Sequence, residues 1–333
     1  MKFGSTPIGE AEGAVLAHAV RTDGIAFKKG DILTRERQLA LAEAGVTSVV
    51  AARLESGDVG ENEAALKLAK RLAGAHLRCA AAFTGRVNMF AEIAGLAIID
   101  AEAIDRVNAV DEGITVATLP PYRVVAHGDM VATVKIIPFA IPGSALEAAL
   151  TLSPSEAITV RSFKPMRIGV VSTTLPGLKA STVAKTLRVL EARLAPTGAR
   201  VVAQEIVPHE VQPLAKALAK LIDGSDVLIA FGASAITDRR DVIPAAVEAI
   251  GGRIERFGMP VDPGNLLLLA ERQGMPIIGA PGCARSPKEN GFDWVLQRVL
   301  AGVPIHDADI RAMGLGGLLM EIASRPQPRA PDD

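Results

Sequence analysis

An apolar, strand-like run beside an amphipathic helical segment most constrains the fold of this 333-residue chain. Residues 226–231 read Asp-Val-Leu-Ile-Ala-Phe, and from the second residue on none is polar. Strands of this composition are typically buried on both faces of a parallel sheet. The preceding segment, residues 211–222, repeats Leu214, Leu218 and Leu221 at helical spacing. The pattern predicts a parallel sheet that helices cover on both faces.

Strand and helix patterns alternate through the second half of the chain but not through the first. In the second half, strands are expected at residues 167–172, 201–207, 226–231 and 276–280, and helices at 180–194, 211–222, 242–250 and 292–300. In the first half, strands are expected at 14–17, 47–52, 113–118 and 122–137, and helices at 35–44, 61–73 and 101–110. We therefore expect the α/β class, with an α+β N-terminal region at 1–160, a three-layer parallel-sheet domain at 165–303, and a C-terminal extension at 304–333 whose tail, 325–333, is disordered.

Composition narrows the classes of function. The net charge is −1 and aromatic residues make up only 3% of the chain, so both the positive charge and the stacking platforms typical of nucleic-acid binding are missing. The chain begins without an apolar signal core, and no stretch approaches the roughly 20 uninterrupted apolar residues of a membrane span. Its two cysteines build neither a disulfide framework nor a zinc pattern. We expect a cytoplasmic protein that binds neither nucleic acid nor membrane.

Four segments of small and polar residues follow apolar runs in the second half. They are 171–174 (VSTT), 232–241 (GASAITDRRD), 260–265 (PVDPGN) and 279–287 (GAPGCARSP). Loops at the carboxyl ends of parallel strands form the ligand site of open α/β sheets. Small residues let the backbone approach a ligand, and free N–H groups bind anions. We expect the segments to converge on one cleft for a phosphorylated small molecule.

Several of these residues also have ordinary structural interpretations. Asp241 suits a helix N-cap as well as a ligand or Mg²⁺ contact. The pair Arg239 and Arg240 fits solvated loop charges as well as phosphate binding. Cys283 reads as a small buried apolar residue rather than a nucleophile. The five histidines, His209 among them, show no metal-binding spacing and read as surface or packing residues.

At these segments the chain resembles the molybdopterin-binding family of molybdenum-cofactor biosynthesis, which includes molybdopterin molybdotransferase. The similarity covers about residues 165–303, where 232–241 resembles a Gly-Gly-x-x-Gly loop, 260–264 a Pro-Gly-x-Pro loop and 280–287 a Leu-Pro-Gly loop. Residues 9–20, 27–31 and 60–73 resemble the N-terminal regions of related bacterial proteins. The chain departs from the family at 173–177, where the acidic residues of the first loop are absent, and at Ala233 and Ala235, which replace glycines.

The resemblance implies a three-layer molybdopterin-binding domain that binds molybdopterin or its adenylylated form and inserts molybdate with Mg²⁺. Asp241 and Asp238 are the implied catalytic residues, with Asp241 as the Mg²⁺ ligand. The implied ligand-binding residues are Ser172, Thr173, Thr174, Gly232, Ala233, Ser234, Asp262, Pro263, Gly264, Asn265, Pro281, Gly282, Cys283 and Ser286. Further expected partners are molybdate, a molybdoenzyme and a second copy of the chain. A non-catalytic cofactor carrier or sensor, or an unrelated nucleotide or sugar-phosphate binder, fits the same loops.

Overall fold

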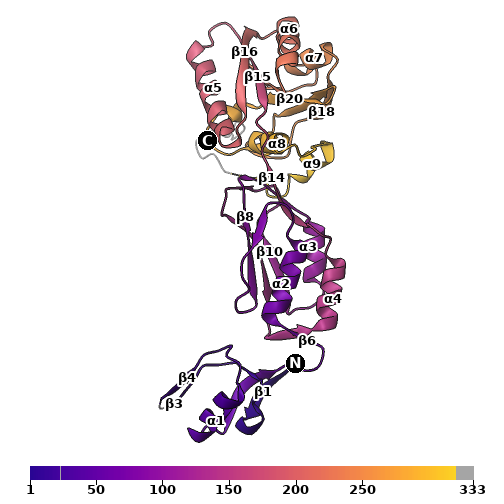
Figure 1. The fold of residues 1–333 in the computed structure, drawn as a ribbon. Helices are drawn as coiled ribbons and strands as arrows, with labels where there is room; N and C mark the ends of the chain where they lie inside the picture. Colours follow the sequence, from indigo (N-terminus) through magenta and orange to yellow (C-terminus); the bar gives the residue numbers. More distant parts are fainter. Residues whose placement is uncertain (23, 320–333) are drawn as a thin grey trace, which may run out of the picture. The chain divides into compact units, whose positions relative to one another are not determined.

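The computed structural model describes residues 1–22 and 24–319, and the chain divides into two compact units (Figure 1). Unit 1 is Met1–Ser162, and unit 2 begins at Phe163. The tail at 325–333, expected to be disordered, lies outside the described residues. The division between residues 303 and 304 stays a prediction.

Unit 2 is built on one six-stranded sheet in the order β16-β15-β17-β20-β19-β18. Its elements are β15 (Arg167–Thr174), α5 (Ala180–Leu194), β16 (Arg200–Pro208), α6 (Val211–Leu221), β17 (Val227–Phe231), α7 (Val242–Ala249), β18 (Arg253–Phe257), β19 (Leu268–Arg272), β20 (Met275–Ala280), α8 (Gly291–Leu300) and α9 (Asp307–Ala312). Strands β16, β15, β17 and β20 pair in parallel.

The two faces of this sheet belong to two separate hydrophobic cores. Val227, Ile229 and Phe231 pack with residues of α5 and α8, and Leu228 and Ala230 pack with residues of α6 and α7. Successive strand side chains point to opposite faces, so an all-apolar strand serves both cores. The two pairs of helices lie on opposite faces of the sheet in Figure 1. The predicted three-layer α/β architecture is confirmed.

Two strands of this sheet, β18 and β19, were not predicted from the sequence. β19 pairs antiparallel with both β18 and β20, so the sheet is not wholly parallel. Because β19 reverses the chain, β18 runs in the same direction as β20. The carboxyl end of β18 therefore lies at the same edge of the sheet as the carboxyl ends of the parallel strands.

Unit 1 mixes short antiparallel sheets with four helices in its described part. Its strands are β1 (Lys2–Pro7), β2 (Val15–Leu16), β3 (Val20–Thr22), β4 (Ile25–Phe27), β5 (Ser48–Arg53), β6 (Asp58–Gly60), β7 (Leu77–Cys79), β8 (Arg86–Ala91), β9 (Gly95–Ile99), β10 (Ile114–Thr118), β11 (Val124–Val125), β12 (Met130–Ile136), β13 (Ala140–Pro142) and β14 (Ile158–Ser162). Its helices are α1 (Arg35–Glu43), α2 (Glu61–Leu72), α3 (Ala101–Asn108) and α4 (Gly143–Leu152). One core lies among residues 11–51 and a larger one among residues 64–160.

The single strand predicted at 122–137 is wrong, because a tight turn divides it. The Asp129 carboxylate accepts a hydrogen bond from the Ala126 amide at 2.8 Å, and Gly128 has φ +90°. Glycine adopts this left-handed conformation without a steric penalty. The two halves join different sheets: β11 pairs with β9, and β12 pairs with β8 and β10.

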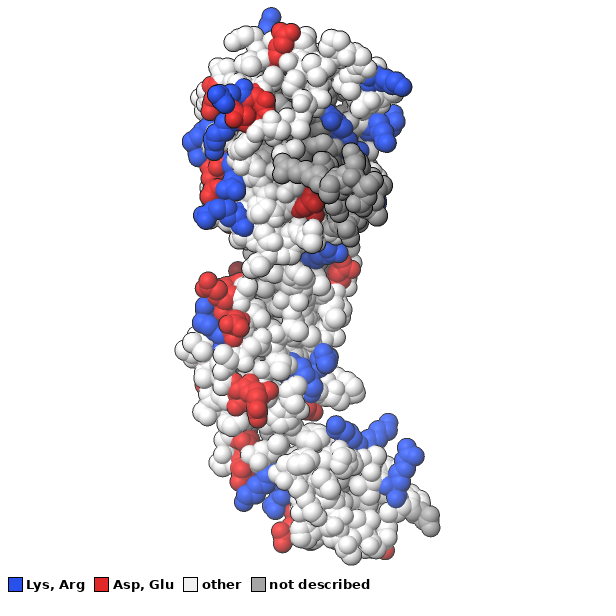
Figure 2. Space-filling model, turned by 180° about the vertical axis from the view of Figure 1, so that it is seen from behind, with Lys and Arg blue, Asp and Glu red and all other residues white. Residues whose placement is uncertain are grey.

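None of the helices in the described ranges combines the length and the apolar character that crossing a bilayer requires. On the face shown in Figure 2, Lys and Arg side chains lie among Asp and Glu side chains.

Candidate functional site

The four small-residue segments leave one edge of the unit 2 sheet. Segment 171–174 ends β15, and 232–241 follows β17. Segments 260–265 and 279–287 belong to the loops 258–267 and 281–290 that follow β18 and β20, and from here on the third and fourth segments mean these whole loops. We call this side of the sheet, with the four segments, the loop edge. Ser172, Thr173 and Thr174, expected in a loop, belong to β15, which runs two residues beyond the predicted end.

The Thr173 hydroxyl joins the first two segments. The backbone N–H of Ala233 donates to its oxygen at 2.8 Å, and the same oxygen lies 2.7 Å from Nδ1 of His209. Thr173 is almost fully buried. His209 follows the end of β16, and its N–H donates to the Thr174 carbonyl at 2.9 Å. His209, expected to be a surface or packing residue, therefore belongs to the loop edge.

Gly232 leaves no room for a side chain at the start of the second segment. A Cβ there would lie 2.6 Å from the Ser234 carbonyl oxygen and 3.0 Å from Cδ1 of Ile243. The Gly232 carbonyl accepts a hydrogen bond from the Arg285 guanidinium at 2.8 Å. This contact joins the segments after β17 and β20.

The third segment meets the first residue of α8 through backbone atoms. The Gly291 N–H donates to the Pro263 carbonyl at 2.8 Å. A Cβ on Gly264, whose φ is +148°, would lie 2.9 Å from both N and Cα of Gly291. Two backbone hydrogen bonds also join the third segment to residues near 318. The Asp262 N–H donates to the Gly317 carbonyl, and the Leu319 N–H donates to the Asp262 carbonyl. Asn265 stays within its own turn, where its carbonyl accepts from the Met259 N–H.

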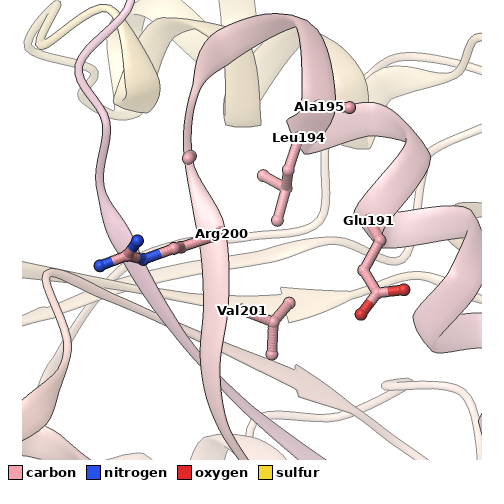
Figure 3. Close-up of a pocket in the computed structure, with 6 residues that line it drawn as sticks. Glu191, Leu194, Ala195, Arg200 and Val201 are labelled. Carbon is pink, nitrogen blue, oxygen red and sulfur yellow. The ribbon is translucent and has the colours of Figure 1, made fainter.

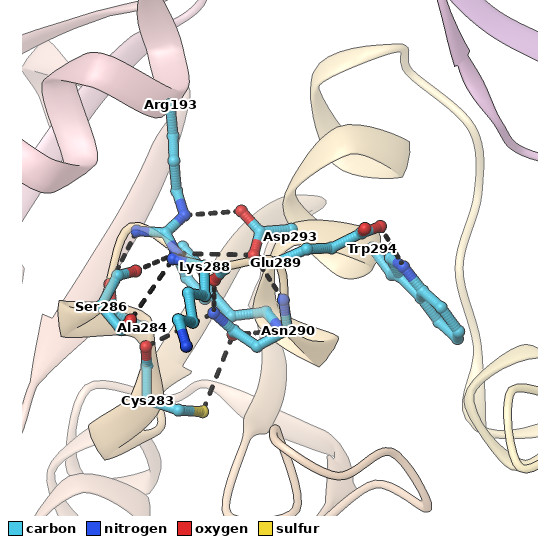
Figure 4. Close-up of polar contacts among 10 residues, drawn as sticks. Arg193, Cys283, Ala284, Ser286, Lys288, Glu289, Asn290, Asp293 and Trp294 are labelled. Atoms are coloured by element: carbon cyan, nitrogen blue, oxygen red, sulfur yellow. Dashed lines mark hydrogen bonds and ion pairs between the residues drawn. The ribbon is translucent and has the colours of Figure 1, made fainter. Parts of the chain in front are cut away.

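A buried arginine of α5 holds the fourth segment in place (Figure 4). Arg193 donates through Nε to Asp293 at 2.5 Å and through its other nitrogens to the carbonyls of Ala284, Ser286 and Lys288. The side chains of Arg193 and Asp293 are only 10% and 11% exposed. The guanidinium thus satisfies three backbone acceptors and one buried carboxylate.

Asn290 completes the fourth segment and starts α8. Its side chain accepts from the Phe292 N–H, and Asp293 accepts from the Asn290 N–H at 2.9 Å, which forms a capping box. The Asn290 amide also donates to the carbonyls of Cys283 and Lys288. The Cys283 thiol lies 3.7 Å from the Asn290 side-chain oxygen. Pro281 and Gly282 begin a short 3-10 helix in this segment.

The two candidate catalytic carboxylates make contacts within their own loop. Asp241 stands at the N-cap of α7, but its carboxylate turns back and accepts from the amides of Thr237 and Asp238. These hydrogen bonds, that of Thr237 first, lower the pKa of Asp241. Asp238 is paired with Arg240 at 2.8 Å, and this contact lowers the pKa of Asp238. Among the described residues, no group of three or more His, Cys, Asp or Glu is placed to hold a metal ion.

A pocket of unit 2 lies away from the loop edge. It opens where α5 ends and β16 begins, and it is lined by Glu191, Leu194, Ala195, Ala199, Arg200 and Val201 (Figure 3). Because β16 starts at Arg200, this pocket lies at the amino edge of the sheet. It is therefore separate from the four segments.

Comparison with protein families identifies the segment that carries the loop edge. Residues 168–302 match the family described as a probable molybdopterin binding domain. The match covers less than half of the chain and lies within unit 2. The loop edge lies within these matched residues, so the similarity to molybdopterin-binding domains falls on the part of the chain that carries it. Residues 5–53 match a second family, described as a domain of unknown function (DUF8806). A search of curated proteins found no match.

Three solved structures are similar to this chain at low sequence identity. The molybdopterin biosynthesis MoeA protein of Pyrococcus horikoshii is 11% identical, with 90% of this chain and 75% of that chain covered and a TM-score of 0.32. The molybdopterin biosynthesis enzyme MoaB of Thermus thermophilus is 19% identical, with 42% and 98% covered and a TM-score of 0.32. The tungsten cofactor synthesizing protein MoaB of Pyrococcus furiosus is 18% identical, with 41% and 91% covered and a TM-score of 0.29.

Proposed function

We propose that the loop edge of unit 2 binds molybdopterin or its adenylylated form. One observation carries the proposal: direct contacts join three segments of a probable molybdopterin binding domain, and a further contact joins the third segment to the first residue of α8, directly after the fourth. Thr173 contacts Ala233, Arg285 contacts Gly232, and Pro263 contacts Gly291. A ligand that meets one segment therefore meets a connected surface.

The chemistry of the loop edge suits a pterin phosphate. Gly232 and Gly264 let the backbone of two segments pack closely against Ser234, Ile243 and Gly291, because a Cβ at either position would clash with them. The backbone N–H and C=O groups of the segments would then meet a flat ring system. Arg285 supplies a positive charge, and guanidinium groups match the geometry of phosphate oxygens. Together these groups offer hydrogen bonds to the heterocycle and a counter-charge to the phosphate.

Mg²⁺ would be bound through Asp241 together with phosphate oxygens of the ligand. Mg²⁺ commonly takes one or two carboxylates and keeps several waters. Asp241→Asn keeps an oxygen that can accept from the Thr237 and Asp238 amides but removes the negative charge. We expect this variant to lose Mg²⁺-dependent binding of the adenylylated ligand and to keep its fold, measured by titration with and without Mg²⁺.

Calorimetric titration with molybdopterin and with its adenylylated form tests the proposal. Gly264→Ala places a methyl group against the Gly291 backbone and should weaken binding at least tenfold. Gly274→Ala is the matched control, because Gly274 also has positive φ but meets nothing within 4 Å. If the wild-type chain gives no heat above background with either ligand, the proposal fails.

A non-catalytic carrier role is the second candidate. It is favoured because the carboxylates of Asp238 and Asp241 are both bonded within their own loop. Asp238 is engaged by Arg240, and Asp241 is engaged by its own loop. A molybdate-dependent assay of AMP release separates the two roles: release identifies a molybdotransferase, and tight binding without release identifies a carrier or sensor. Delivery to a molybdoenzyme and assembly into a homo-oligomer remain parts of the proposal, and sedimentation velocity of the full chain measures the latter.

A further inference from the structure

Arg285 is a half-buried cation whose anionic partner is missing from the described part of the chain. One terminal nitrogen donates to the Gly232 carbonyl at 2.8 Å, and the guanidinium carbon lies 6.0 Å from the centre of the Phe231 ring. Its Nε is buried and meets no acceptor among the residues that the structure describes. An unsatisfied buried donor on a charged group is costly, so it calls for an explanation.

Arg193 contacts the same segment and, unlike Arg285, has an anionic partner among the described residues. Its guanidinium meets the Asp293 carboxylate and three carbonyls. Arg285 has one carbonyl and an aromatic ring instead. Burial lowers the pKa of Arg285, as expected for a cation that gives up water without gaining an anion. Arg193 therefore fixes the fourth segment, whereas Arg285 has guanidinium N–H groups that are not used within the described part of the chain.

We propose that Arg285 is the anion-recognition residue of the loop edge and that its guanidinium binds a phosphate oxygen of the ligand. The inference rests on the proposed function, since the phosphate of the pterin supplies the missing anion. A phosphate monoester or diphosphate can accept from both terminal nitrogens at once, in the fork geometry that arginine offers and lysine does not. The Gly232 carbonyl then aims the guanidinium rather than neutralising it.

The test compares Arg285→Met, Arg285→Lys and the wild-type chain, with Arg200→Met as the control. Arg200 is exposed and stands at the amino edge of the sheet, away from the four segments. Pyrophosphate is the probe, and thermal unfolding and calorimetric titration are the two readouts. We expect pyrophosphate to raise the Tm of the wild type and of Arg200→Met. Its affinity should fall at least about tenfold in Arg285→Met and less in Arg285→Lys.

The ligand-free proteins separate recognition from a structural role. Because Arg285→Met removes an uncompensated cation and keeps the apolar stem, its Tm without ligand should equal or exceed that of the wild type. A ligand-free Tm that falls by several degrees would show that the Gly232 contact is structural, and the inference would be lost. Unchanged pyrophosphate affinity in Arg285→Met, or no binding by the wild type, would overturn it as well.

Titration with molybdopterin distinguishes this inference from the proposed function. If wild type and Arg285→Met bind molybdopterin equally, the proposed function holds and the role of Arg285 is disproved. If pyrophosphate binding depends on Arg285 but molybdopterin does not bind, Arg285 stays the anion-recognition residue and the pterin is not its ligand.

Discussion

At the scale of single residues, the ion pair of Arg193 and Asp293 is the contact on which the fourth segment most depends. Both side chains are nearly buried, and the pair also fixes three backbone carbonyls and the capping box of α8. Loss of one member leaves the other charged, buried and unpaired, which is far more costly than loss of an exposed pair. We therefore expect residues 281–290 to lose their ordered conformation when either Arg193 or Asp293 is replaced.

Asp293→Ala should destabilise unit 2 by about 3–5 kcal/mol, because it leaves the Arg193 cation without its carboxylate. Denaturant unfolding followed by circular dichroism measures the loss. Arg240→Met is the control: its partner Asp238 is an exposed neighbour on the same loop, so no measurable change is expected. Equal effects of the two substitutions would contradict the assignment of the buried pair.

The Asp241 carboxylate should make the loop after β17 sensitive to acid. Its pKa lies below the ordinary value of 3.8, chiefly because the Thr237 N–H donates to the charged form. A depressed pKa means that the contribution to stability is complete above 3.8 and is lost as pH falls through the lower, folded-state pKa.

Amide NMR signals of Thr237 and Asp238 should thus stay constant from neutral pH down to about 4 and shift only below it. In Asp241→Asn the same signals should lack this step, because asparagine does not titrate. A step that persists in the variant would assign the titration to another group.

At the scale of secondary-structure elements, Thr173 works as a cross-link between β15, the end of β16 and the loop after β17. Its hydroxyl is the acceptor of the Ala233 N–H and the partner of His209. An isosteric Thr173→Val change should leave that N–H without an acceptor and cost about 1–3 kcal/mol. Thr173→Ser keeps the hydroxyl and should recover most of the loss. Chemical denaturation measures both, and equal stabilities of the valine and serine variants would exclude the cross-link.

The sequence predicted those elements of unit 2 whose apolar residues follow a clear pattern, because their side chains pack into one or both hydrophobic cores. The apolar run of β17 serves both cores, and α5 spans the predicted residues 180–194. β18 and β19 were not predicted because charged residues, among them Arg253 and Glu271, lie within them and break the run of apolar residues. In unit 1 the strand at 122–137 was overextended, since the turn at Asp129 interrupts an otherwise β-prone stretch.

The candidate site could be predicted only in part from the sequence, because some of its contacts join residues that are far apart along the chain. The glycines and prolines of the four segments are local signals, and they lie where loops were expected. His209 and Arg193 act through partners 36 and about 100 residues away, so only the strand order and the packing of α5 reveal them. His209 directly follows a strand, but its place beside Thr173 depends on β16 being the neighbour of β15.

At the scale of the whole molecule, the two units carry separate hydrophobic cores. Leu68 lies in the larger core of unit 1, and Phe292 lies in the α5/α8 core of unit 2. Each side chain is fully buried. Leu68→Ala should cost about 2–5 kcal/mol and Phe292→Ala about 3–5 kcal/mol, each in its own unit.

Differential scanning calorimetry of the full chain tests this division. Each substitution should lower the transition of one unit and leave the other unit's transition in place. Molybdopterin should raise only the transition that Phe292→Ala lowers. A single transition that responds to both substitutions alike would show that the units unfold together.

The reversal of the chain at β19 has a practical outcome for labelling. The hairpin between β19 and β20 turns at Gln273 and Gly274, whose φ values of +51° and +82° suit a two-residue hairpin turn. This turn lies at the amino edge, since β20 begins there and ends at the loop edge. A short fluorescent tag inserted between Gln273 and Gly274 should leave the loop edge unchanged and mark unit 2 for single-molecule measurement of the proposed ligand binding.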